Sequence, residues 1–495
     1  MVPVVGTGES TSVKMSHLEH CNFPILKAKG LKSAKYITKR RRSQSNSRRI
    51  RQRQLDFLSI IPCKVNVQSL PEEAAQMSVL SSVWRQACVF HPNLYFGIET
   101  FLGSHAKGGV CSDPSKRMPA INKFIERVDA ILKNHCGTQV NKFAVNFGLS
   151  IEHANHINRW VLFGIASKAR VISLNLSPNR SIFSCDHYDF PFQLFNGQNA
   201  SYLQVLQLDS VTLGSPPDFC GFANLKMLDL YNVILLQDLQ HFLSKCCVLE
   251  WLSIRSCFEM SHLCVPEPLC HLQYLCLQDC DFHNIEFHAP NLTTFEYTGA
   301  PVLMNLNECL KLKTATIALS LNKTLKYVLI GIPSILPHVE TMHVELEITT
   351  EMSGFIQYPP KFIRLKHLTM ETTCWGDPRS VFQLAYLLEA APLLEDLHLE
   401  MFGLNPICCP IDLQDVMDLP HYHLKTVCIK GFCGNSGQVE LAKYILKNAL
   451  ILEHLIVKPG RKYKVSTLST IFEHWRKEAK EELAPLARDG VLTIV

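Results

Sequence analysis

The stretches LQVLQLDS (203–210), LKMLDLYN (225–232), LEWLSIRS (249–256) and LQYLCLQD (272–279) share one arrangement of apolar residues. Each has an apolar residue at a first position, i, and again at i+3 and i+5. Successive side chains of a strand point to opposite faces, so residues i+3 and i+5 share one face of a short strand. Residue i then closes the same core from the preceding turn. One such unit leaves its apolar face open, so neighbouring units must stack to bury it.

The triplet recurs along the chain at intervals of 20 to 30 residues, close to the period of leucine-rich repeats. Segments 235–246 and 380–392 carry apolar residues at three- and four-residue spacing, so helices are expected there. Between 280 and 335 the period is short, and irregular or strand-only repeats are expected. The sequence therefore predicts an α/β leucine-rich-repeat solenoid, a curved parallel sheet with outer helices. The further triplets are Ala169/Ile172/Leu174, Leu292/Phe295/Tyr297, Leu312/Ala315/Ile317, Val339/Met342/Val344, Leu365/Leu368/Met370, Leu394/Leu397/Leu399, Leu424/Val427/Ile429 and Leu452/Leu455/Val457, with Val140/Phe143/Val145 as a candidate before them.

Composition excludes several classes of protein. The chain has 495 residues, of which 47% are hydrophobic, so it is too long for one compact domain and has ample material for a core. It contains no run of about 20 apolar residues, so no membrane span is expected. Its N-terminus does not resemble a signal peptide, which predicts a nuclear or cytoplasmic protein that is not secreted. The 20 cysteines are then expected to be reduced packing residues and not metal ligands, because those between 246 and 280 form no C-x-x-C pair.

Basic residues are concentrated near one end of the chain. Eight lysines and arginines lie within 39–53, interleaved with Ser, Gln and Asn. Such a segment buries too little apolar surface to offset its ordering entropy, which predicts a disordered tail over 1–52. Two interpretations remain open, a nuclear-import signal and a solvated leader without function. Nucleic acid is not an expected partner, because no aromatic residues accompany the charges for base stacking. The import signal would be Lys39, Arg40, Arg41 and Arg42.

Residues 72–96 resemble the second half of a plant F-box. The match includes Ala74-Ala75, Ser78-Val79-Leu80-Ser81, Trp84-Arg85 and His91-Pro92-Asn93-Leu94, and 73–87 reads as one amphipathic helix. Residues 423–457 resemble the FBD module, through Gly431-Phe432, Glu440-Leu441-Ala442 and Asn448-Ala449 among others, in the order strand, glycine turn, helix and strand. Together, 69–460 resemble the plant F-box/leucine-rich-repeat/FBD family. The motif's opening Leu-Pro-(Glu/Asp)-Asp turn and first helix have no good match before 69, so the F-box segment is degenerate.

The resemblance implies a substrate-recognition subunit of a Skp–cullin–F-box ubiquitin ligase, with the F-box segment binding the Skp adaptor. The alternative is a protein-binding scaffold with a decayed F-box and no link to ubiquitin. The chain is then expected to divide into a basic tail (1–52), a partial F-box (53–100), a linker and first helix (101–139), the solenoid (140–460, FBD-like over 385–460) and a C-terminal cap helix and strand (461–495). The adaptor-binding residues would be Leu70, Pro71, Ala75, Val79, Leu80 and Trp84.

The binding surface for a protein substrate is expected on the concave face, where positions i+2, i+4 and i+6 point away from the core. Met227, Trp251 and Tyr274 would form an exposed apolar patch with Tyr231 and Arg255 beside it. Trp, Tyr and Arg are enriched at binding hot spots. Alternatively, an insertion or the C-terminal segment covers this patch.

Farther along the same face an acidic column is expected. Glu345, Glu371 and Glu400 all occupy position i+6, where like charges on neighbouring strands repel one another. A basic partner segment, or the chain's own 39–53, would relieve that repulsion, and a solvated charged face is the alternative. The sequence shows no P-loop, G-x-S-x-G, H-E-x-x-H or dinucleotide fingerprint. No enzyme activity, cofactor or metal is therefore expected.

Overall fold

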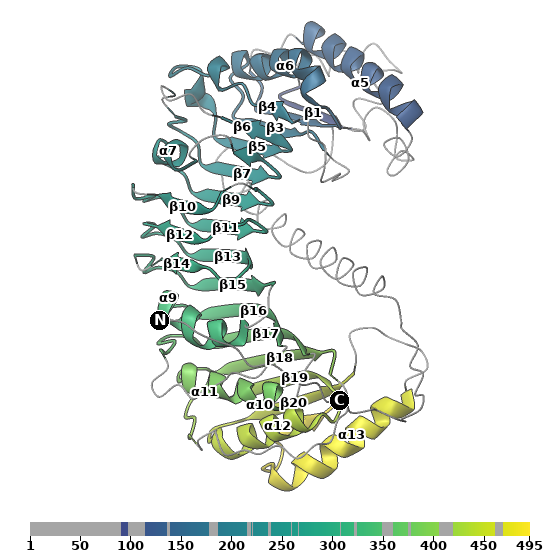
Figure 1. Cartoon of the computed structure of the whole chain (residues 1–495), viewed down its shortest axis with the longest axis vertical. Helices are drawn as coiled ribbons and strands as arrows, with labels where there is room; N and C mark the ends of the chain where they lie inside the picture. Colours follow the sequence, from purple (N-terminus) through teal and green to yellow (C-terminus); the bar gives the residue numbers. More distant parts are fainter. Residues whose placement is uncertain are drawn as a thin grey trace, which may run out of the picture. The chain divides into compact units, whose positions relative to one another are not determined.

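The computed structural model describes residues 91–97, 114–135, 139–177, 187–214, 219, 221–235, 239–258, 260–265, 267–306, 308–320, 324–348, 360–374, 378–404, 419–460 and 469–495. All of them fall in one compact unit, residues 70–495. Within them, fifteen strands form a single parallel sheet, the main sheet, in which they stack one after another (Figure 1). In spatial order its strands are β1 (Asn93–Gly97), β2 (Lys142–Asn146), β3 (Val171–Asn175), β5 (Val205–Asp209), β7 (Met227–Tyr231), β9 (Trp251–Arg255), β11 (Tyr274–Gln278), β13 (Thr294–Gly299), β15 (Thr314–Leu319), β16 (Thr341–Ile348), β17 (His367–Cys374), β18 (Asp396–Phe402), β19 (Thr426–Phe432), β20 (His454–Pro459) and β21 (Leu492–Ile494).

The apolar triplets set the register of the main sheet. Leu228 pairs with Leu252, and Leu252 with Leu275, so equivalent positions of successive repeats lie side by side. All three leucines are fully buried in one continuous core, as are the residues two positions after each. The predicted leucine-rich-repeat α/β solenoid is confirmed, and its core lies where the i, i+3 and i+5 residues converge.

The strands in the first half of the main sheet end in a repeated backbone turn. Ser210, Asn232, Ser256 and Asp279 all stand at i+7 and have φ between 51° and 61°, a left-handed conformation that Asn, Asp and Ser tolerate better than bulky residues. Each donates its backbone N–H to a carbonyl at or next to the end of the following strand, that of Tyr231, Arg255, Gln278 and Thr298 in turn, over 2.7 to 3.0 Å. The turn thereby extends the hydrogen-bonded ladder by one residue before the chain leaves the sheet.

The segments that connect one strand of the main sheet to the next, the return segments, are helical in some repeats and extended in others. As expected from the short period, the repeats between 280 and 320 return through strands, which form a small three-stranded sheet with β10. Residues 324–335, also expected to be irregular or strand-only, instead return through short helices and a π-helical turn. Residues 380–390 of segment 380–392 are helical as expected, and in the described part of 235–246 a short helix forms over Leu239–Ser244. The strands of the two small sheets are β4 (Tyr188–Asp189), β6 (Val211–Leu213) and β8 (Ile234–Leu235), and β10 (His262–Val265), β12 (Asn284–Phe287) and β14 (Leu303–Asn305).

Helices dominate the returns at both ends of the main sheet (Figure 1). One face of α6 (Ala154–Ala166) packs on the sheet. It carries apolar residues at three- and four-residue spacing, all of them buried, namely Ile157, Trp160, Val161 and Ile165. The helices are α5 (Pro114–Asn134), α6 (Ala154–Ala166), α7 (Leu239–Ser244), α8 (Thr324–Lys326), α9 (Ile332–Ile335), α10 (Pro378–Phe382), α11 (Tyr386–Ala390), α12 (Ser436–Asn448) and α13 (Ser469–Leu483), with 3₁₀ turns at Ile151–His153, Phe192–Leu194, Ala200–Tyr202, Gln383–Ala385 and Ala484–Leu486 and a π-helical turn at Tyr327–Gly331.

The main sheet begins earlier than the triplets alone indicate. β1 pairs in parallel with β2, with Leu94 beside Phe143 and Phe96 beside Val145. Residues 93–97, assigned from the sequence to the partial F-box, are therefore the first strand of the solenoid, and the boundary at residue 140 is too late. Position i of this repeat is His91, a polar residue, and the apolar pattern is incomplete for that reason.

Residues 423–457 fold as strand, glycine turn, helix and strand, namely β19, a turn, α12 and β20. Gly431 has φ +78°, and a Cβ there would lie 1.9 Å from the carbonyl oxygen of Met401, so only glycine fits. Asn435 caps α12 by accepting the Gly437 N–H over 3.0 Å. The fully buried Gln438 accepts the Cys433 N–H over 2.9 Å and donates to the Gly431 carbonyl over 3.1 Å, which fastens the helix to the glycine turn.

Candidate functional site

The face of the main sheet opposite the core carries the residues at i+2, i+4 and i+6, and we name it the non-core face. In β9, Leu252 and Ile254 point into the core, and Trp251, Ser253 and Arg255 alternate with them. Because the register is continuous from β3 to β19, equal positions on this face form columns that cross the sheet. It is the surface on which the sequence placed the substrate-binding residues.

The expected apolar patch forms, but it is not exposed. Met227, Trp251 and Tyr274 are neighbours in register, and the Trp251 and Tyr274 rings stack with centroids 3.5 Å apart and planes 16° from parallel. All three side chains are nevertheless buried, with 0%, 3% and 5% of their surface exposed. The expectation of an exposed hot spot at these residues is therefore wrong in this structure.

A buried ion pair lies beside this stack. The Arg255 Nη2 donates to both carboxylate oxygens of Asp229, over 2.8 and 3.1 Å, and the guanidinium also lies over the Tyr231 ring, 5.3 Å from its centroid. Burial lowers the pKa of Arg255, but the Asp229 carboxylate outweighs this effect and holds the pKa above its ordinary value. Arg255 is thus committed to contacts within the chain, and its expected role in holding a partner is not supported by this geometry.

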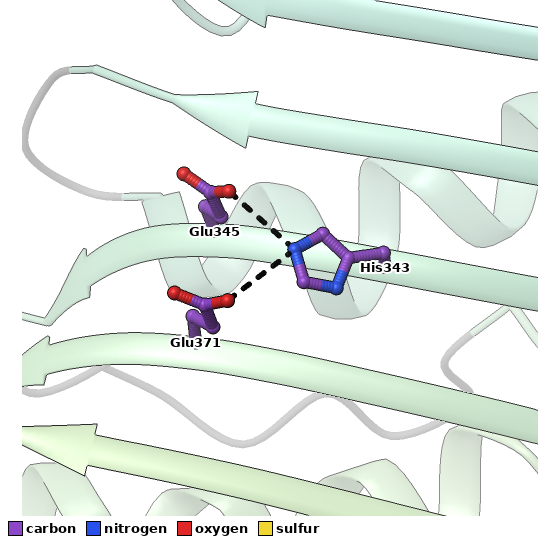
Figure 2. Close-up of side chains that lie close together, drawn as sticks. All are labelled: His343, Glu345 and Glu371. Atoms are coloured by element: carbon purple, nitrogen blue, oxygen red, sulfur yellow. Dashed lines mark hydrogen bonds and ion pairs between the residues drawn. The ribbon is translucent and has the colours of Figure 1, made fainter. Parts of the chain in front are cut away.

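A second cluster lies on β16 and β17 and joins His343, Glu345 and Glu371 (Figure 2). Glu345 and Glu371 are directly opposite in register, and His343 is two residues before Glu345, so its side chain points from the same face. The His343 Nε2 lies 3.4 Å from the Glu345 Oε1 and 3.8 Å from the Glu371 Oε1. The His343 and Glu345 side chains are only 15% and 11% exposed, whereas Glu371 is 34% exposed. The cluster is therefore partly shielded from solvent, and Glu371 is its most exposed member.

The acidic column is compensated in part from within the sheet. Glu400 continues the column next to Glu371, and Lys430 follows it on β19. Lys430 forms an ion pair with Glu400, and this hydrogen bond raises the pKa of the lysine above its ordinary value. The acidic column expected from the sequence is therefore not three carboxylates without partners. His343 contacts Glu345 and Glu371, and Lys430 contacts Glu400.

The other predicted sites lie outside the described residues. These are the adaptor-binding residues between Leu70 and Trp84 and the import signal Lys39–Arg42. In the part of the chain that the structure describes, no helix is long and apolar enough to cross a membrane.

The site residues expected from the sequence did not include Asp229 and His343, which complete these clusters. Asp229 and His343 are both at i+4, a column of the non-core face that was not compared between repeats. Lys430 stands in the acidic column at i+6 and has the charge that Glu400 needs. The i+4 column is therefore the sequence signal that indicates Asp229 and His343, and the i+6 column already contains Lys430 beside Glu400.

Comparison with known proteins places the chain among leucine-rich-repeat sequences. The family model described as "At1g61320/AtMIF1, LRR domain" matches residues 131–485. The F-box/FBD/LRR-repeat protein At1g13570 of Arabidopsis thaliana is 23% identical over 434 residues, which cover 84% of this chain and 94% of that protein. From the same plant, F-box protein At3g03040 is 25% identical over 252 residues, 49% of this chain and 51% of its own. The F-box/LRR-repeat protein At3g59210 is 26% identical over 259 residues, 49% of each chain. Neither the family model nor these relatives indicates an enzyme family.

Proposed function

Because the chain belongs to the leucine-rich-repeat family described as At1g61320/AtMIF1, we propose that it is the substrate-recognition subunit of a Skp–cullin–F-box ubiquitin ligase. In this role it holds a protein substrate on the solenoid and joins it to a Skp-type adaptor and a cullin. Catalysis then resides in other subunits of the ligase, and this chain is not an enzyme. The observation that carries the proposal is the match to an F-box/FBD/LRR-repeat protein along 94% of that protein's length.

The solenoid supports the binding half of this proposal. Side chains on the non-core face extend from strands that are fixed on both sides by neighbours, so ordering them on a partner costs little entropy. Of the residues expected to bind, Glu371 and Glu400 are partly exposed, whereas Met227, Trp251 and Tyr274 are buried. We therefore place the substrate contact on the acidic half of the face, around β16 to β19, and expect a basic segment in the substrate.

The adaptor half rests on residues 73–87, where Ala75, Val79, Leu80 and Trp84 are proposed to pack against the Skp adaptor after Leu70-Pro71. An apolar helix face binds its partner by burial, so a charge on that face opposes binding. Leu80→Asp should abolish co-purification with a co-expressed Skp adaptor, and Trp84→Ala should weaken it strongly. Arg85→Ala, on the neighbouring position, is the matched control and should co-purify as the unchanged chain does.

The second candidate function is a protein-binding scaffold without a link to ubiquitin. It is favoured by the departure from the F-box pattern before residue 69, where the opening turn and first helix have no good match. If the unchanged chain does not co-purify with the adaptor, while a relative with an intact F-box does under the same conditions, the ligase role is excluded and the scaffold remains.

A further inference from the structure

The described residues contain one group of three His, Cys, Asp or Glu side chains whose ligand atoms converge, and it consists of His343, Glu345 and Glu371. We propose that these three residues bind one divalent transition-metal ion, with Zn²⁺ as the best fit. The proposal goes beyond the proposed function, since neither adaptor binding nor a protein substrate requires a metal.

The spacing of the three ligand atoms fits a small tetrahedral ion. Zn²⁺ is held about 2.0–2.2 Å from imidazole nitrogen and carboxylate oxygen, so two ligands of a tetrahedral ion lie about 3.4 Å apart. The His343 Nε2 is 3.4 Å from the Glu345 oxygen and 3.8 Å from the Glu371 oxygen, and all three ligand atoms lie within 4.8 Å of one another. Two of these separations are thus at or near the edge length of such a tetrahedron.

The donor set selects the class of ion. One imidazole and two carboxylates suit Zn²⁺ and its neighbours in the first transition row, whereas Mg²⁺ and Ca²⁺ prefer oxygen ligands alone. Two carboxylates opposed on adjacent strands repel each other, and an ion between them removes that repulsion.

The position of the cluster supports a site that is fixed yet accessible. The ligands come from two central strands with a continuous register, which holds them with little freedom. His343 and Glu345 are largely sheltered, and Glu371 is the most exposed of the three. Three protein ligands leave the fourth tetrahedral position for water or for a side chain of a bound partner, as in zinc sites that exchange a ligand.

The test is a Zn²⁺ titration of the full-length protein, purified without metal and kept reduced, in competition with a chromophoric chelator. The chain's 20 cysteines provide other places for Zn²⁺, so the readout is the difference between variants. Glu371→Gln keeps the shape of the side chain and His343→Ala removes the nitrogen ligand. Each should abolish one equivalent of binding or weaken it by at least about tenfold, because even loss of an outer partner of a metal ligand costs about 10–100-fold.

The matched control is His367→Ala. His367 also pairs with a carboxylate on the next strand of the same face, with its Nδ1 2.7 Å from the Asp396 Oδ2, but belongs to no group of three. This variant should bind as much Zn²⁺ as the unchanged chain. Co²⁺ bound at the site should show d–d absorption, lost in Glu371→Gln, without the charge-transfer band of thiolate ligands. If His343→Ala and Glu371→Gln both bind Zn²⁺ with the stoichiometry and affinity of the unchanged chain, or if His367→Ala loses the same equivalent, there is no metal site here.

Discussion

The Asp229–Arg255 ion pair allows a quantitative test of the non-core face. The two side chains are only 10% and 11% exposed, and they extend from adjacent strands β7 and β9. Asp229→Ala removes the carboxylate and leaves the buried guanidinium without the partner that it contacts over 2.8 and 3.1 Å. Breaking a buried pair in this way costs about 3–5 kcal/mol, because an uncompensated charge stays buried. We therefore expect Asp229→Ala to lower the free energy of unfolding by about 3–5 kcal/mol.

The matched variant removes both charges. Asp229→Leu combined with Arg255→Met fills a similar volume with apolar groups, and such replacements are often neutral or stabilising by about 1–4 kcal/mol. The double variant should thus be more stable than Asp229→Ala, although it changes more residues. Urea denaturation followed by tryptophan fluorescence is a suitable assay, since Trp251 lies on the same strand as Arg255. If Asp229→Ala lowers the free energy of unfolding by less than about 1 kcal/mol, the Arg255 guanidinium is hydrated, and this part of the non-core face is not buried as described.

Three further predictions concern the core, a buried histidine and the N-terminal tail. Leu252→Ala should lower the free energy of unfolding by about 2–5 kcal/mol in urea denaturation, because it leaves a cavity at a fully buried position. The control is Leu310→Ala, at a residue that is 63% exposed, and it should change the free energy of unfolding by less than about 0.5 kcal/mol. Burial lowers the pKa of His421, whose Nε2 donates to the Ala391 carbonyl over 3.1 Å and whose Nδ1 accepts the Leu424 N–H over 3.0 Å. The unfolded chain then binds the extra proton first, so stability should fall as the pH drops through about 6.5. His421→Gln should flatten this dependence, and an unchanged pH profile of stability in that variant would contradict it. Changing Lys39, Arg40, Arg41 and Arg42 to Ala should reduce nuclear accumulation of a fluorescent fusion, and an unchanged distribution would show that the run is inert.

The repeat architecture was predictable from the sequence because the triplet encodes it locally. A leucine at i+3 can be buried only by the equivalent leucines of the neighbouring repeats, so the pattern at Leu228, Leu252 and Leu275 determines both the strand and its register. The terminal strands are harder to recognise because their first position is polar, His91 before β1 and Asp489 before β21. Terminal repeats have no neighbour on one side, so a complete apolar triplet is not required there.

The candidate sites were only partly predictable. Period two in a strand determines which face a side chain occupies, and that placed Trp251 and Tyr274 correctly opposite the core. It carries no information on what lies over that face, so their burial was not predictable. Contacts between columns depend on rotamers and register together, so the approach of His343, at i+4, to Glu345 and Glu371, at i+6, was not indicated by the pattern of either column.

The most direct test of the proposed ligase role is a bridging measurement with the immobilised full-length chain. If the chain is a substrate-recognition subunit, purified cullin should be retained when a Skp adaptor is present and should not be retained without it. Leu80→Asp should abolish this retention, while Glu371→Gln, far along the solenoid, should leave it unchanged. If neither adaptor nor cullin is retained by the unchanged chain, while a relative with an intact F-box retains both, the chain is not a subunit of such a ligase.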